Sequence, residues 1–259
     1  MKYNCLKVWF EEQVAHVQLN TPENQNHLSA EMAQELLSVA RELMEKDDIK
    51  VIILGGQGSD FSCGLFPGEN ADELEYDGYE TINLVCTAIE EWARLPYPII
   101  AALHGQCRSL GLSLACIADL RYATNDTVFS VPETTWGLVP AGGITQRLPR
   151  LIGKGPAMSV LLGGESVQAD RAFELGLANR LSNENDVWTE ACREGRRLAN
   201  MSTLSTQFTK ETLLKGSEMP FDQALRLELD IYMLLQTSGD RMEGINAFLE
   251  KRTPQFKGN

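Results

Sequence analysis

Two turns in the sequence place backbone groups where they could act on a bound ligand. The first is residues 61–65 (Phe-Ser-Cys-Gly-Leu), where we expect Gly64 to let the backbone turn so that the amide of the next residue points into a cavity. The second is residues 104–119 (His-Gly-Gln-Cys-Arg-Ser-Leu-Gly-Leu-Ser-Leu-Ala-Cys-Ile-Ala-Asp), where a buried strand ends in small residues and a helix begins. Free N–H groups at such a helix start can stabilise a developing oxyanion. The alternatives are an ordinary surface turn and a strand-to-helix connection that binds nothing.

One carboxylate, Glu133, is a candidate for acid/base chemistry. It lies in residues 129–143 (Phe-Ser-Val-Pro-Glu-Thr-Thr-Trp-Gly-Leu-Val-Pro-Ala-Gly-Gly), just after an apolar strand and in a loop bounded by prolines and glycines. Partial desolvation beside Trp136 would raise the pKa of this carboxyl and suit it to proton transfer. The alternative is a solvated or helix-capping glutamate.

Composition and motifs argue against several other kinds of site. The second turn lacks the GxGxxG spacing of a dinucleotide site, and no HExxH or comparable metal pattern occurs, so neither NAD nor a metal is expected. The six cysteines form no CxxC pair and no signal peptide is visible, which predicts reduced thiols in a cytoplasmic protein. A formal net charge of −13 disfavours duplex nucleic acid as a partner, and no apolar run is long enough for a membrane helix. A small anionic ligand stays possible.

The elements that must position these residues follow an alternating pattern in the first half of the chain. Apolar segments predict strands, and helical spacing predicts an amphipathic helix at 30–46 and a helix at 110–118. The strands are expected at 14–19, 51–54, 98–103, 120–124 and 128–131. This βαβ-like order predicts an α/β fold with parallel pairing. The acidic residues 69–78 are expected to form a mobile surface segment.

Beyond about residue 143 the pattern becomes helical. Helices are expected at 169–175, 186–199, 204–215, 220–236 and 240–250. No strand is predicted after Val131. Together these patterns describe an α/β core followed by a helical C-terminal third.

Six blocks of the chain resemble the crotonase (enoyl-CoA hydratase/isomerase) superfamily. The resemblance covers nearly the whole length, and the blocks are residues 61–64, 104–119, 129–143, 145–153, 174–181 and 243–252. It implies a spiral core of ββα units, expected over 1–195, and a helical oligomerisation region over 196–259. It also implies a homotrimer or hexamer that acts on acyl thioesters of coenzyme A.

The resemblance assigns roles residue by residue. The backbone N–H groups of Leu65 and Leu110 would form the oxyanion hole, and Glu133 and Ser113 would be the catalytic side chains. The adenine end of coenzyme A would meet the C-terminal helix of a neighbouring subunit. The residues expected to contact substrate are Cys63, Gly64, Gly111, Trp136, Gly142, Phe248 and Lys251.

Departures from the family pattern narrow the chemistry. Hydratases of the family use two glutamates around a water, whereas Ser113 occupies the first of those positions here and Glu133 the second. The family's enoyl isomerases use one glutamate as a proton shuttle. Feruloyl-type hydratase-lyases also pair a serine with a glutamate, and some biosynthetic members that act on carrier-protein thioesters keep only the later glutamate. Residues 109–111 (Ser-Leu-Gly) replace the three glycines of many members, and Asn24 stands where a Lys or Arg is common.

We therefore expect an enzyme that stabilises a thioester enolate with Glu133 as its only acid/base. The reaction would be hydration/dehydration or double-bond migration, with no cofactor besides the coenzyme A of the substrate. The alternatives are a hydratase-lyase, a biosynthetic dehydratase on an acyl-carrier thioester, and a scaffold that kept the fold and lost the chemistry.

Overall fold

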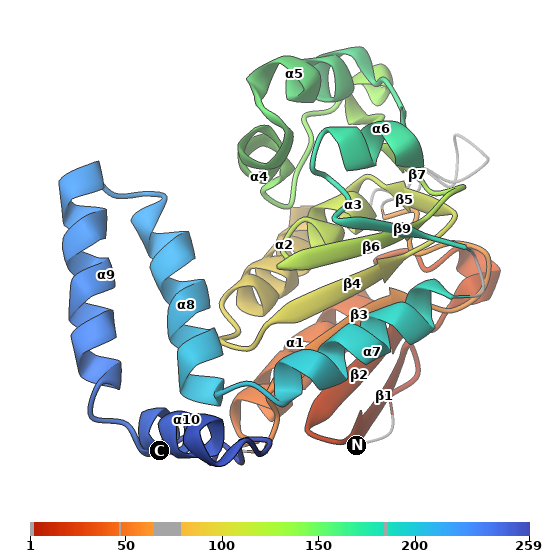
Figure 1. Cartoon of the computed structure of the whole chain (residues 1–259). Coiled ribbons are helices and arrows are strands. Elements are labelled where there is room, and N and C mark those ends of the chain that lie inside the picture. The colour runs from red at the N-terminus through yellow and green to blue at the C-terminus, as the bar shows by residue number, and fades with distance from the viewer. Residues whose placement is uncertain (1–2, 47, 65–78, 184–185) are drawn as a thin grey trace.

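A computed structural model describes residues 3–46, 48–64, 79–183 and 186–259 (Figure 1). The strands are β1 (Leu6–Glu11), β2 (Val14–Leu19), β3 (Val51–Gly56), β4 (Ile99–Leu103), β5 (Gln106–Arg108), β6 (Leu120–Thr124), β7 (Val128–Ser130), β8 (Val167–Gln168) and β9 (Arg180–Ser182). The helices are α1 (Ala30–Met44), α2 (Tyr79–Ala93), α3 (Leu110–Ala115), α4 (Ile144–Ile152), α5 (Lys154–Gly163), α6 (Ala169–Glu174), α7 (Val187–Ala199), α8 (Thr203–Gly216), α9 (Phe221–Leu235) and α10 (Gly239–Glu250). Short 3-10 turns occur at Pro22–Asn24 and Glu133–Trp136.

The main sheet has six strands in the order β1-β2-β3-β4-β6-β9. Only β1 pairs antiparallel to its neighbour, and the other pairs are parallel. Helices cover both faces: α1 and α2 pack on one side, and α7 crosses the other (Figure 1). Strands covered on both faces are apolar along their whole length, as in the fully buried β4 sequence Ile-Ile-Ala-Ala-Leu.

A second, three-stranded sheet, β5-β7-β8, lies beside the carboxyl end of the main one. In it β5 runs parallel to β7, and β8 antiparallel to β7. The prediction that no strand follows Val131 is therefore wrong, because β8 and β9 both do. They have two and three residues, too few to show an alternating pattern. The edge strand β1 and the three-residue β5 also escaped prediction.

The remaining expectations agree closely with the structure. The predicted helices match α1, α3, α6, α7, α8, α9 and α10, with ends that differ by up to three residues. The α/β core with a helical C-terminal region is confirmed. The predicted boundary at 195/196 stays a prediction, and residues 69–78 lie outside the described residues. None of the described helices is long and apolar enough to cross a membrane.

Helices α8 and α9 form an antiparallel arm that projects away from the sheets (Figure 1). Lys210 attaches the arm to the core, because its Nζ lies 2.8 Å from both the Asp119 carboxylate and the Tyr97 carbonyl. An ion pair between Arg150 and Glu218 makes a second attachment. The arm is thus fixed to the core at identifiable points, although it buries little of its own surface.

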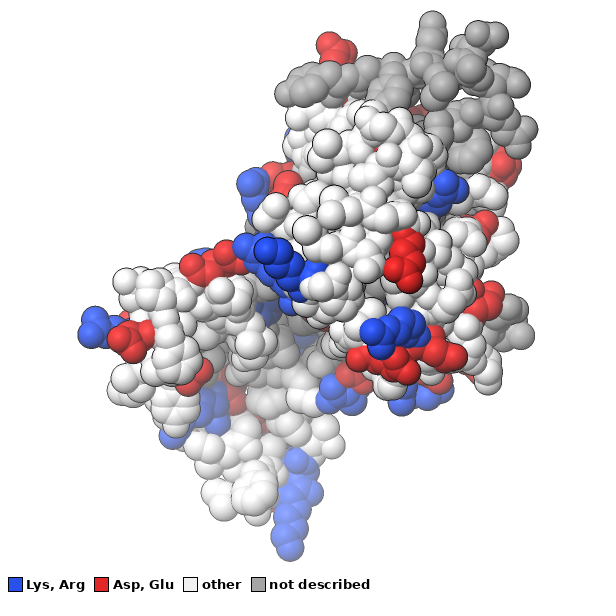
Figure 2. Space-filling model, turned by 90° about the horizontal axis from the view of Figure 1, so that it is seen from above, with Lys and Arg blue, Asp and Glu red and all other residues white. Residues whose placement is uncertain are grey.

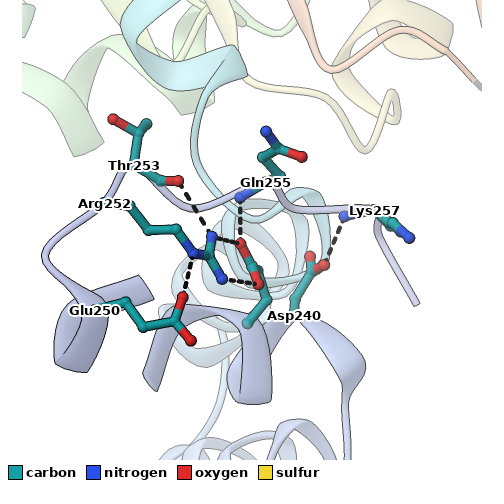
Figure 3. A network of polar contacts seen from close by, with 7 residues as sticks. Asp240, Glu250, Arg252, Thr253, Gln255 and Lys257 are labelled. Carbon is teal, nitrogen blue, oxygen red and sulfur yellow. Dashed lines mark hydrogen bonds and ion pairs between the residues drawn. The ribbon is translucent and has the colours of Figure 1, made fainter. Parts of the chain in front are cut away.

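The C-terminal segment folds back along α10 through a polar network (Figure 3). Arg252 pairs with Glu243 and Glu250, each at 2.6 Å. The backbone N–H of Gln255 donates to Glu243, and that of Lys257 donates to the buried Asp240. These bonds fix the chain that follows α10, including Lys251 at its end.

Candidate active site

The parallel pair β5 and β7 brings Ser109 and Glu133 together, although they are 24 residues apart in the chain. Arg108 pairs with Ser130 at the ends of these strands, and Ser109 N–H donates to Ser130 O at 2.9 Å. Because both strands end at the same edge, the residues that follow them become neighbours. The Ser109 hydroxyl donates to Glu133 Oε1 at 2.6 Å, within the short range of a charge-assisted hydrogen bond.

Glu133 is buried, with 3% of its surface exposed. Burial raises the pKa of its carboxyl above the usual value, while the hydrogen bond from Ser109, a backbone hydrogen bond and the nearby Arg108 charge oppose the rise. Its second oxygen, Oε2, has no hydrogen-bond partner among the residues that the structure describes. A buried carboxyl with a raised pKa and one unbonded oxygen is suited to taking up and returning a proton.

Gly64 lies against the start of α3. A Cβ added to it would lie 2.5 Å from Arg108 O and 2.6 Å from the backbone nitrogens of Leu110 and Gly111. Gly64 also has a φ of +66°, which glycine adopts without strain. The two turns predicted to carry oxyanion donors are therefore in contact at their glycines. Leu65 itself lies outside the described residues, so its role stays a prediction.

Leu110 is the first residue of α3 and is fully buried. No described residue accepts a hydrogen bond from its N–H. Buried backbone N–H groups are almost always paired. A free one at this point is the feature that an oxyanion site needs.

Ser113 lies one helical turn beyond Ser109 and is completely buried. Its hydroxyl donates to Ala141 O at 2.9 Å. A Cβ added to Gly142 would lie 2.8 Å from the Cβ of Ser113. The packing of Gly142 against both Leu110 and Ser113 brings this part of the predicted site together. No hydrogen bond joins Ser113 to Glu133 in the described structure, so the two predicted catalytic side chains are not directly coupled.

Trp136 and Cys63 flank the same region. The Trp136 ring lies 5.0 Å from the guanidinium carbon of Arg108, the neighbour of Ser109. The Cys63 thiol lies 3.1 Å from Gln25 Oε1, and burial raises its pKa, so it stays protonated. Arg108 and Ser109 were not predicted as site residues. Ser109 had one sequence signal, its place in a stretch where many family members have glycine.

Phe248 and Lys251 lie on and just after α10, at the opposite end of the molecule from β5 and β7 (Figure 1). Phe248 is 83% exposed. Within one chain the structure does not bring them to Glu133.

In the part of the chain that the structure describes, one group elsewhere has possible metal-ligand atoms, namely Cys5, Glu31 and Glu35. Glu35 accepts hydrogen bonds from the backbone N–H groups of Asn4 and Cys5. Burial raises the pKa of the Cys5 thiol to about 11, which disfavours the thiolate that a metal requires. These contacts attach the N-terminal segment to α1.

An α/β core thus places the buried Glu133 carboxyl close to the Leu110 N–H, which has no acceptor among the described residues. A family model described as enoyl-CoA hydratase/isomerase matches residues 10–259. The chain is 33% identical over 251 residues to a 2,3-dehydroadipyl-CoA hydratase of Escherichia coli, covering 96% of each protein. It is 29% identical to an enoyl-CoA hydratase structure from Bacillus anthracis, with a TM-score of 0.92 over 99% of this chain and 100% of that one. The chain belongs to the enoyl-CoA hydratase/isomerase family.

Proposed function

We propose that the protein transfers a proton to and from the carbon next to the carbonyl of an acyl-coenzyme A thioester, with Glu133 as the single acid/base. The observation that carries this proposal is the environment of Glu133, which is buried, accepts a hydrogen bond from Ser109 at Oε1, and has no partner for Oε2 among the residues that the structure describes. Removal of the proton leaves an enolate, whose negative oxygen the Leu110 and Leu65 N–H groups would stabilise. Return of the proton to another carbon moves the double bond.

The position of Ser113 favours a one-carboxylate mechanism. A paired hydratase site needs two carboxylates around one water, and the first of these positions carries a hydroxyl that already donates to Ala141 O. Double-bond migration needs only one group that moves a proton between two carbons. Hydration with water held by the Ser113 hydroxyl oxygen is the second candidate, which the names of the hydratase relatives favour.

A thioester panel tests this proposal. The panel contains 2-enoyl, 3-enoyl and 3-hydroxyacyl-coenzyme A, and the products are identified by mass spectrometry. We expect the protein to turn over at least one of these thioesters. Glu133→Gln should keep the fold and the affinity for thioester while lowering turnover by about 10²-fold or more. Turnover within a few-fold of the parent would remove Glu133 from the mechanism. Comparing turnover of the same acyl groups on coenzyme A and on a carrier protein shows which thioester carrier the enzyme prefers.

We also propose that the chain assembles as a trimer or a dimer of trimers. Helices α8 and α9 contain no buried residue. Large apolar side chains are exposed on α8 to α10: Leu213, Leu214, Phe221, Leu225, Leu229, Tyr232, Met233, Leu234, Met242, Ile245, Phe248 and Leu249. Apolar surface of this extent is typical of an interface between subunits. Light scattering at micromolar concentration should give about three or six times the chain mass of 28.8 kDa, and a monomer would contradict the proposal.

The charge on one face of the molecule gives no support to duplex nucleic acid as the partner. On the face shown in Figure 2, basic and acidic side chains are interspersed among uncharged ones, without an extended basic area in its described part. Duplex binding depends on clustered Lys and Arg.

A further inference from the structure

Ser109 has an unusual backbone conformation for its residue type. Its φ is +55° and its ψ is −131°, a region that residues other than glycine rarely adopt. Such a conformation persists only where the surroundings hold it. Here the Ser109 N–H is bonded to Ser130 O at 2.9 Å, and its carbonyl accepts from Ser113 N–H at 3.1 Å. The sequence thus keeps a side chain at a position where glycine would be free of strain.

The side chain at this position contacts Glu133. Ser109 is completely buried, and its hydroxyl donates to Glu133 Oε1 at 2.6 Å. A hydroxyl has one proton to donate, so in this arrangement the bond is committed to Oε1. Glu133 Oε2 is also buried and has no partner among the described residues. The two oxygens of one carboxyl are therefore in different environments.

We propose that Ser109 is a positioning residue that reserves Glu133 Oε1 as an acceptor, so that Oε2 is the oxygen that takes the proton from the substrate carbon and returns it. In the forward step the C–H bond breaks, its electron pair stays on the substrate as the enolate, and the proton bonds to Oε2. In the return step the O–H bond at Oε2 breaks and the proton bonds to carbon. This inference rests on the proposed role of Glu133.

Ser109 also connects the carboxyl to the oxyanion site. It directly precedes Leu110, whose N–H is the predicted oxyanion donor. One dipeptide therefore provides both the hydroxyl bonded to Glu133 and the N–H that would stabilise the enolate.

The hydrogen bond from Ser109 favours the charged carboxylate and so opposes the effect of burial on the pKa of Glu133. Arg108 acts in the same direction, and these two are the described side chains that lower this pKa.

The test removes the hydroxyl in two ways. Ser109→Gly removes it and accepts the positive φ without strain, whereas Ser109→Ala removes it and keeps the strain. Ser182→Ala is the matched control, because the Ser182 hydroxyl donates to Glu190 Oε2 at the same 2.6 Å and is on the far edge strand β9. Thermal melting of all three variants checks that each is folded.

The first readout needs no substrate. Infrared difference spectra, taken between the parent and Glu133→Gln across pH, give the titration of Glu133 and the C=O stretch of its protonated form. If the proton is on Oε2, then Oε1 is the C=O that accepts from Ser109. Both Ser109 variants should then raise the C=O frequency and the pKa of Glu133, and Ser182→Ala should change neither. An unchanged C=O frequency in folded Ser109 variants would overturn the proposal.

The second readout is the pH profile of kcat/KM with the best thioester. We expect the acid limb to move to higher pH in both Ser109 variants, and kcat to fall by about 10- to 10²-fold with little change in KM, as the loss of a charge-assisted hydrogen bond predicts. A lower melting temperature with an unchanged profile would mean a merely structural role and would overturn the proposal. If Glu133→Gln itself keeps full turnover, the proposed function fails and the positioning role fails with it. If only Glu133→Gln impairs turnover, the proposed function stands and the role of Ser109 is refuted.

Discussion

Gly64→Ala tests whether the contact between the two turns sets the oxyanion geometry. The added Cβ would lie 2.6 Å from the backbone nitrogens of Leu110 and Gly111, where ordinary contact begins at 3.4 Å. Since the nearest atom, Arg108 O, would be only 2.5 Å away, the turn or the start of α3 must move by up to about 0.9 Å to restore ordinary contact. A misplacement of about 1 Å in a catalytic group can cost about 10²-fold in rate. We expect a loss of that size in kcat/KM.

The stability cost of this change has two parts. A residue other than glycine in a left-handed conformation costs about 1–2 kcal/mol, and overpacking adds about 1–3 kcal/mol. Gly176→Ala is the matched control, because its φ of +78° imposes a similar strain while the nearest atom to its added Cβ is 3.9 Å away. At about 2–4 °C per kcal/mol for domains of 150–250 residues, both variants should melt at lower temperature, and Gly64→Ala the lower of the two.

The assay compares turnover and carbonyl polarisation in the two variants. Difference infrared spectra of a bound thioester report how strongly the site polarises the C=O bond. We expect Gly64→Ala to lose both rate and polarisation, and Gly176→Ala to keep both. A folded Gly64→Ala variant with turnover within threefold of the parent would refute the reasoning that this contact positions the donors.

Two further changes test other parts of the structure. Ser113→Glu should raise hydration of a short 2-enoyl thioester, since a second carboxylate beside Glu133 would supply the missing partner for water. Overpacking at the buried site costs about 1–3 kcal/mol of stability. If the variant folds and binds crotonyl-coenzyme A as well as the parent but hydrates it no faster, the assignment of Ser113 to the first glutamate position is contradicted. His16 is buried and stacked on Trp9 at 4.9 Å, and burial lowers its pKa in the folded state, so the unfolded state binds more protons. The free energy of unfolding should therefore decrease as pH falls below about 6.5, the pKa of histidine in the unfolded state. In urea titrations at several pH values, His16→Phe should make the free energy of unfolding depend less on pH in this range. The same pH dependence in parent and variant would contradict the role of His16.

The local pattern of apolar and polar residues was enough to predict most helices and the buried strands. The helix α1 shows its apolar face and its Ser29 cap directly in the sequence, and β4 is a continuous apolar run. The strands β8 and β9 could not be predicted in this way, because two or three residues carry no period and their pairing depends on distant partners. Sheet edges of this kind are fixed by tertiary contacts, which no single segment encodes.

The site was predictable as a set of residues but not as a geometry. Glu133 could be proposed from its strand, prolines and neighbouring Trp136. Its bond to Ser109 could not, since that contact depends on the parallel register of β5 and β7 and on a left-handed backbone at Ser109. Sequence showed only that a serine replaces a common glycine. The structure shows what the side chain of that serine contacts.

Hydrogen exchange at the substrate carbon tests the central claim most directly. The parent is incubated in deuterated water with an acyl-coenzyme A thioester that it binds, and deuterium in the acyl group is followed by mass spectrometry. The account predicts incorporation at the carbon next to the carbonyl or at the γ-carbon, slowed by about 10²-fold or more in Glu133→Gln. Equal incorporation by the two proteins, or none by the parent with any bound thioester, would contradict it.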